Sequence, residues 1–129
     1  MTRREARIIT MQILYTADLN KCSIDEAIDN VIEGELSPEV SLFIDLIKDN
    51  LDNIDSIISK SLVNYSIDRL NVVDKAIIRL ATAELLSKKT DKKIVINEAL
   101  EITKEYSDQG DRKATSFNNR LLDNICKNI

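Results

Sequence analysis

The 129-residue sequence has no histidine and no tryptophan, and it has only two glycines, one proline and two cysteines. It also has no glycine-rich phosphate loop, no serine or cysteine beside a plausible base, and no metal-ligand spacing. These are the groups that most enzymes need for acid–base, nucleophilic or metal-assisted chemistry. We therefore expect no enzyme activity, no bound metal and no cofactor.

The shortage of glycine and proline also bears on the fold. A sheet-rich protein needs turn residues between its strands, and this chain has almost none. Isoleucine, leucine, alanine, lysine and aspartate dominate instead, which predicts an all-α fold. The length suits one compact domain over residues 1–129. Cys22 and Cys126 are far apart in the sequence, and we expect them to be free thiols.

No apolar run approaches the roughly 18 residues that a membrane helix needs. The apolar run from Ile8 to Ala17 is interrupted by Thr10 and Gln12, and no small-residue cleavage site follows it. The sequence therefore predicts a cytoplasmic protein with no membrane partner.

The net charge of −4 argues against nucleic-acid binding until it is followed along the chain. Residues 21–60 hold ten acidic and three basic residues, whereas the segments on either side are slightly basic. Because a polyanion responds to local potential, a chain with basic ends can still present one surface to RNA.

Apolar residues at helical spacing, together with cap residues such as Ser23, Ser37-Pro38 and Asn71, predict six helices. Their approximate ranges are 3–19, 24–34, 38–63, 72–89, 94–106 and 111–128. The longest is the one after Pro38. Eight residues lie on the apolar faces of these predicted helices, and we expect them to be buried in the core: Phe43, Ile47, Ile54, Ile77, Leu80, Leu100, Phe117 and Leu121.

The first predicted helix carries a polar stripe. Arg4, Arg7, Met11 and Tyr15 share one face, and Gln12 lies beside it. Arginines can pair with phosphates, a tyrosine ring can stack on an unpaired base, and a glutamine amide can contact a base edge. The stripe is typical of single-stranded RNA recognition, although three arginines can also form a solvated face and Tyr15 can be half-buried core.

Several motifs resemble those of a known family. The segment IDRLNVVDKAIIRLATAELL precedes IVINEALEITKEY and a terminal SFNNRLLDNI, and the chain opens with Arg3-Arg4-Glu5-Ala6-Arg7 followed by Gln12-Ile13-Leu14-Tyr15. This order resembles the NusB family of bacterial transcription antitermination factors, with its R-R-x-A-R…Q-x-L-Y opening, R-L-A-x-x-E-L, V-I-N-E-A and F-V-N-G-V-L-D. Only residues 21–65 are matched by helical pattern alone.

The resemblance implies six to seven helices in two packed three-helix halves. It also implies binding of boxA-type single-stranded RNA with the ribosomal protein NusE, within the RNA polymerase antitermination complex. By position, it assigns RNA contacts to Arg7, Gln12, Tyr15 and Asn119, and partner contacts to Glu84 and Tyr106. Arg3 and Arg4, at the start of the same predicted helix, are further expected RNA contacts.

The chain departs from the family pattern at two positions. Asn118 and Arg120 replace the valine and glycine of F-V-N-G, and Arg120 could add a phosphate contact. The loop from Ser107 to Ser116 is longer than is common. Either Asp108 or Asp111 could take the place of the loop acid that tunes RNA affinity in the family.

Two other functions fit parts of the sequence. A helical adaptor could dock a basic partner on the acidic segment, with the arginines incidental. The chain could also be a relative of the NusB-like domain that precedes certain RNA cytosine methyltransferases, although no catalytic domain follows in this sequence.

Overall fold

The computed structural model describes residues 1–129 and is all-helical, as the composition predicts. It contains seven α-helices and one short 3-10 helix. In chain order these are α1 (Arg3–Asn20), α2 (Ile24–Val31), α3 (Pro38–Lys48), α4 (Leu51–Ser61), η1 (Ile67–Arg69), α5 (Val72–Ser87), α6 (Lys92–Tyr106) and α7 (Lys113–Lys127).

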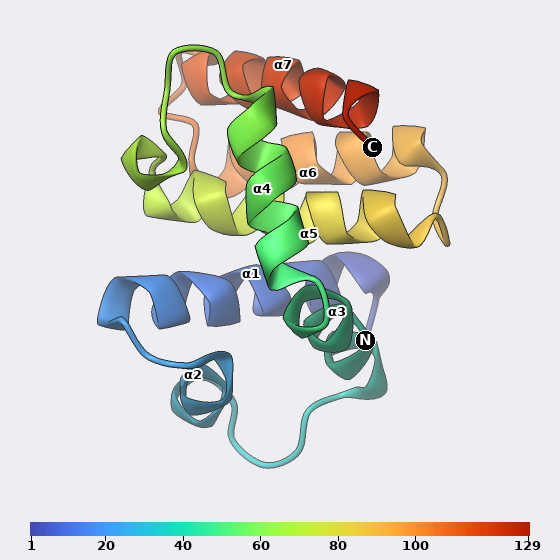
Figure 1. The fold of residues 1–129 in the computed structure, drawn as a ribbon. Coiled ribbons are helices and arrows are strands. Elements are labelled where there is room, and N and C mark those ends of the chain that lie inside the picture. Colours follow the sequence, from blue (N-terminus) through green and yellow to red (C-terminus); the bar gives the residue numbers. More distant parts are fainter.

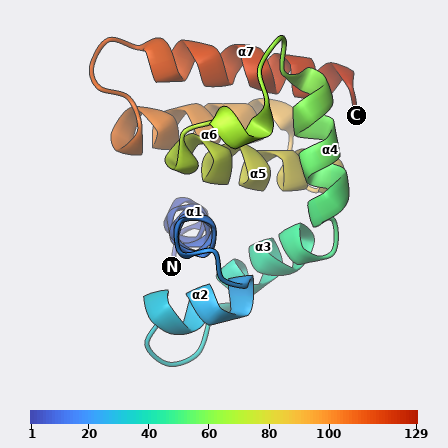
Figure 2. The same ribbon diagram turned by 60° about the vertical axis from the view of Figure 1, so that its left-hand side comes forward.

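The helices form two packed groups, with α1, α2 and α3 on one side and α4 to α7 on the other (Figures 1 and 2). Helix α5 lies at the centre and packs against α1, α3, α4, α6 and α7. Helix α1 packs against α2 and α3 on one side and against α5 on the other. These contacts join the two groups into one core.

Polar caps fix where the helices begin. Thr2 and Glu5 form a capping box at the start of α1, and the hydroxyl of Ser23 accepts a hydrogen bond from the backbone N–H of Glu26 at the start of α2. Asn71 and Asp91 cap α5 and α6 in the same way. Each cap satisfies a backbone N–H that the helix itself leaves unpaired.

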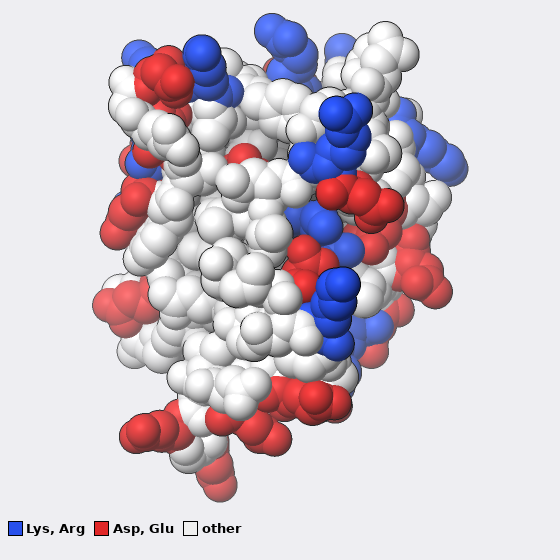
Figure 3. Space-filling model, turned by 90° about the vertical axis from the view of Figure 1, so that its left-hand side faces the viewer, with Lys and Arg blue, Asp and Glu red and all other residues white.

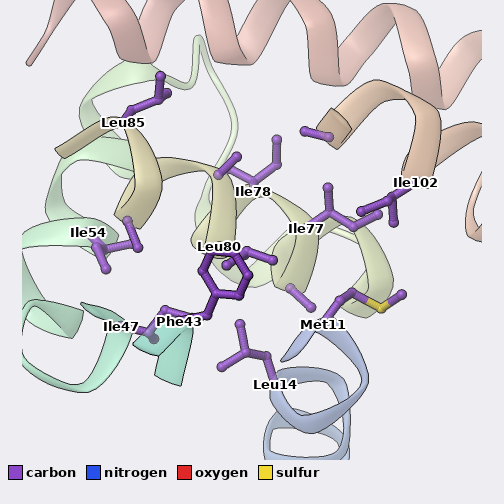
Figure 4. Close-up of a cluster of buried hydrophobic side chains, with 14 of the residues drawn as sticks. Met11, Leu14, Phe43, Ile47, Ile54, Ile77, Ile78, Leu80, Leu85 and Ile102 are labelled. Carbon is purple, nitrogen blue, oxygen red and sulfur yellow. The ribbon is translucent and has the colours of Figure 1, made fainter. Parts of the chain in front are cut away.

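The core contains 26 buried apolar residues drawn from every α-helix of the chain. Figure 4 shows the centre of this cluster, where Leu80 and Ile77 of α5 lie above Leu14 and Met11 of α1. Six of the eight predicted core residues are buried: Phe43, Ile47, Ile54, Ile77, Leu80 and Leu121.

The other two predicted core residues are corrected by the structure. Leu100 is half-buried, and Phe117 is 40 % exposed. Phe117 lies near the start of α7, where its ring faces Tyr65 instead of the core. The buried positions of this turn are taken by Asn118 and Leu121.

The predicted long helix from Pro38 to Val63 is also wrong, because it is broken into α3 and α4. The break falls at Asp49 and Asn50, where the Asn50 side chain donates a hydrogen bond to the carbonyl of Leu46. Asparagine competes with the helical backbone for such bonds. The apolar stripe keeps its phase across the break, since Ile47 and Ile54 are both fully buried, so periodicity alone gave no sign of it.

Every helix of the structure is too short or too polar to span a lipid bilayer.

Candidate nucleic-acid interface

The residues predicted to contact RNA do not form one continuous stripe. On α1, Arg3, Arg4 and Gln12 are exposed, Tyr15 is half-buried, and Arg7 is only 3 % exposed. Met11, in the middle of the stripe, is also buried. The reason is that α1 is enclosed by α2 and α3 on one side and α5 on the other, so two of its faces are apolar.

Arg7 forms a buried ion pair with Glu84 of α5. The Arg7 Nε and Nη2 atoms donate to the two carboxylate oxygens of Glu84, each at 2.8 Å, and both side chains are 4 % exposed. Burial alone would lower the pKa of Arg7, but the hydrogen bonds and charge of Glu84 outweigh it, and the pKa is raised. The structure thus places neither residue where RNA or a partner protein could reach it without breaking the pair.

The start of α1 carries the exposed arginines. Arg4 pairs with Glu98 of α6 through bonds of 2.8 and 3.2 Å, and about half of the Arg4 side chain remains exposed. Arg3 has no carboxylate partner, and its guanidinium lies 5.6 Å from the centre of the Phe43 ring. The Arg7 guanidinium contacts the same ring at 5.5 Å. This end of α1 therefore carries one positive charge without an ion-pair partner, on Arg3, and one that is paired with a carboxylate, on Arg4.

Further along α1, Gln12 is free to meet a ligand, whereas Tyr15 packs partly against the core. Figure 3 shows the face of the molecule that contains the end of α1 and the start of α5. On this face uncharged side chains cover the centre and the area to its left, and a column of basic and acidic side chains runs directly beside them. This face thus places an uncharged area next to charged side chains.

The departures from the F-V-N-G pattern lie on α7 and have different consequences. Asn118 is fully buried, and its amide donates to Asp74 and to Thr103, each at 3.1 Å. The position is thus an interior one, and the amide is held by polar groups of α5 and α6. Asn119 and Arg120 are exposed, so they remain available for RNA.

Sequence reasoning missed the aromatic pair formed by Tyr65 and Phe117. Their ring centres lie 5.8 Å apart at an angle of 59°, and the two residues are 39 % and 40 % exposed. The pair borders a shallow hollow of about 130 Å³ that Arg120 also lines. Arg69 adds a second cation, 5.7 Å from the Tyr65 ring. One sign of this pair is present in the sequence: a tyrosine lies in the polar connection between two predicted helices, in a chain with only five aromatic residues.

The loop between α6 and α7 is organised by Asp108. Its carboxylate accepts hydrogen bonds from the Thr115 hydroxyl at 2.6 Å and from the backbone N–H groups of Gly110, Arg112 and Thr115. Asp111 accepts one backbone bond, from Lys113. The hydrogen bond from the Thr115 hydroxyl, followed by those from the backbone, lowers the pKa of Asp108 despite some desolvation.

Replacing Asp108 by alanine should therefore lower the melting temperature more than replacing Asp111. Because the folded pKa of Asp108 lies below its ordinary value, its contribution to stability is complete above about pH 4 and is lost as the pH falls through the folded pKa. Thermal melts of the two variants between pH 7 and pH 3 would check this. Equal melting temperatures at pH 7 would show that the loop does not depend on Asp108.

The two residues predicted to contact a partner protein differ in exposure. Tyr106, at the end of α6, is 40 % exposed, whereas Glu84 is 3 % exposed. Glu84 is nonetheless one of the residues that line a cleft of about 340 Å³, together with Arg3, Phe43 and acidic residues of α3.

Comparison with known proteins gives a consistent result. Residues 4–127 match the model of the NusB family. The chain is 42 % identical to the transcription antitermination protein NusB of Clostridium botulinum, over 98 % of this chain and 99 % of that protein. It is 36 % identical to the protein of the same name from Bacillus subtilis, over 100 % and 98 % of the two chains.

Two solved structures have a similar fold. NusB from T. maritima superposes with a TM-score of 0.85 at 31 % identity, covering 98 % of this chain and 92 % of the other. The second is a structure of the antitermination factors NusB and NusE in complex with dsRNA. It superposes with a TM-score of 0.82 at 32 % identity, covering 97 % and 96 %.

Proposed function

We propose that this chain, which belongs to the NusB family of transcription antitermination proteins, binds boxA-type single-stranded RNA together with the ribosomal protein NusE. The mechanism is assembly without catalysis. By binding both RNA and NusE, the protein holds the nascent transcript near RNA polymerase, in the cytoplasm. Charge supplies much of the affinity, and contacts to unpaired bases supply the specificity.

The observation that carries this proposal is the partly exposed Tyr65–Phe117 pair, with the Arg69 guanidinium over the Tyr65 ring and Arg120 lining the adjoining hollow. Half-exposed aromatic rings offer faces on which unpaired bases can stack, and Arg69 and Arg120 are placed to meet the phosphates that join them. Asn119 is exposed on α7 but does not line this hollow, so in this proposal it contacts RNA separately from the aromatic pair. Such stacking requires bases that are not already paired, which favours single-stranded RNA.

Helix α1 supplies a second group of RNA contacts in this proposal. Arg3 and Arg4 bind phosphates, while Gln12 and the exposed part of Tyr15 contact bases. Arg7 acts indirectly, because its pair with Glu84 fixes α1 against α5 and so fixes the spacing between the two groups. Tyr106 contacts NusE, and Glu84 contributes to that interface only through its position in the fold.

The Arg3→Gln/Arg4→Gln double variant tests the phosphate contacts. With NusE present, it should bind a boxA-type RNA more weakly at low salt. The slope of log affinity against log salt should become shallower by roughly 0.7 for each phosphate that is no longer neutralised. Fluorescence titrations at several salt concentrations would measure both. Lys21→Gln/Lys60→Gln, which removes two exposed charges elsewhere, is the matched control.

The same titrations test the proposal as a whole. If the parent protein forms a complex with NusE but that complex binds no RNA, the proposal is wrong and the helical adaptor is the better description. If the arginine variant matches the control in affinity and slope, the arginines are a solvated face.

A further inference from the structure

Four lysines surround the short connection between α5 and α6. Lys88, Lys89, Lys92 and Lys93 are all exposed, and none of them forms an ion pair. No aromatic residue lies in this segment. It is therefore suited to meeting negative charge but not to stacking on bases.

This lysine surface, defined by those four residues, joins the start of α1. Figure 1 shows the α5–α6 connection, the start of α1 and the end of α7 at the same end of the molecule, opposite η1 and the start of α7. The Arg3 guanidinium donates to the Thr90 hydroxyl at 3.2 Å. A hollow of about 400 Å³ lies beside the connection, lined by Leu85, Lys88, Thr90, Asp91, Lys92, Cys126 and Ile129. The positive surface thus continues from Arg3 across the turn.

No neighbouring acid forms an ion pair with these lysines, although Glu39, Asp45 and Asp49 line a cleft together with Arg3 and Lys89. The Asp91 carboxylate accepts the backbone N–H of Lys93 as the cap of α6, and Glu98 and Glu84 are paired with Arg4 and Arg7. Helix dipoles contribute little net field here, because two helices begin at this end and two end there. Residues 88–93 contain four lysines and one aspartate, so the connection itself keeps a net charge of +3.

We propose that the lysine surface binds the phosphodiester backbone of RNA that extends beyond the segment read by its bases. When exposed lysines neutralise RNA phosphates, the cations condensed on the RNA are released, and this release favours binding at low salt. This contact does not depend on base sequence. It extends the surface that RNA occupies from Arg3 onto the α5–α6 connection. It rests on the proposed function, because it extends the same RNA.

The test compares two RNAs in the presence of NusE: a short boxA-type oligonucleotide, and the same oligonucleotide extended on either side by uridines. The variant replaces the four lysines by glutamine. The control replaces Lys21, Lys48, Lys60 and Lys104 by glutamine, which removes the same charge from other surfaces. Each set includes one lysine with left-handed backbone, Lys88 or Lys21, so the two sets carry similar conformational strain.

We expect the parent and the control to bind the extended RNA more tightly than the short one. The lysine variant should not show this gain, with a deficit of roughly fivefold at 0.1 M salt for each phosphate that is no longer neutralised and a shallower salt slope. If the lysine variant and the control gain equally from the extension, the inference is wrong while the proposed function stands. If the parent binds neither RNA, the proposed function itself fails.

Discussion

Glu84→Gln is expected to lower the free energy of unfolding by about 3–5 kcal/mol, because it leaves the buried guanidinium of Arg7 without a counter-charge. Both side chains are 4 % exposed, and the two 2.8 Å hydrogen bonds between them are the only ones that the guanidinium makes in the structure. Glutamine keeps the shape and one acceptor but cannot neutralise the charge. Urea unfolding of the parent and the variant would measure the decrease.

Glu98→Gln is the matched control. It breaks the other ion pair between α1 and the second group of helices, but about half of the Arg4 side chain in that pair is exposed. Water solvates the freed charge, so the free energy of unfolding should fall by less than about 1 kcal/mol. If both variants are destabilised by the same small amount, water reaches the Arg7–Glu84 pair in solution and the pair is not buried.

The pair also changes how a partner interface can be probed. A Glu84 variant is expected to destabilise the whole fold, so a change in its NusE binding would not by itself locate the interface. Tyr106 is exposed and is the better probe. We expect Tyr106→Ala to leave stability nearly unchanged, and any decrease in NusE affinity can then be assigned to removal of the phenol ring from the interface.

Local features of the fold could be predicted from the sequence, because they depend on residues close together in the chain. The caps at Ser23, Ser37 and Asn71 are found where predicted, and the family resemblance is confirmed over residues 4–127. The break at Asn50 was missed because the apolar stripe continues through it.

The candidate site was harder to predict, because its environment depends on distant segments. Arg7 meets Glu84, which is 77 positions away, and nothing in the α1 pattern indicates that a second helix covers this face. Phe117 has the spacing of a core residue, yet its ring faces Tyr65 from the α4–α5 connection. In both cases the periodicity identified a helix correctly, but the packing of other elements decided which of its residues are exposed.

The aromatic pair should account for the preference for unpaired RNA. In the Tyr65→Ala/Phe117→Ala variant, with NusE present, we expect boxA-type single-stranded RNA to bind more weakly by about 1–3 kcal/mol for each base that stacks. The salt slope should stay unchanged, since no cation is removed. Binding of a duplex of the same sequence should change little, because its bases are already stacked on one another. Titrations of both RNAs with the parent, this variant and Leu42→Ala, which removes an exposed apolar side chain elsewhere, would measure these effects. An equal decrease in affinity for single strand and duplex would mean that the pair supports the fold of α7 and does not stack on bases.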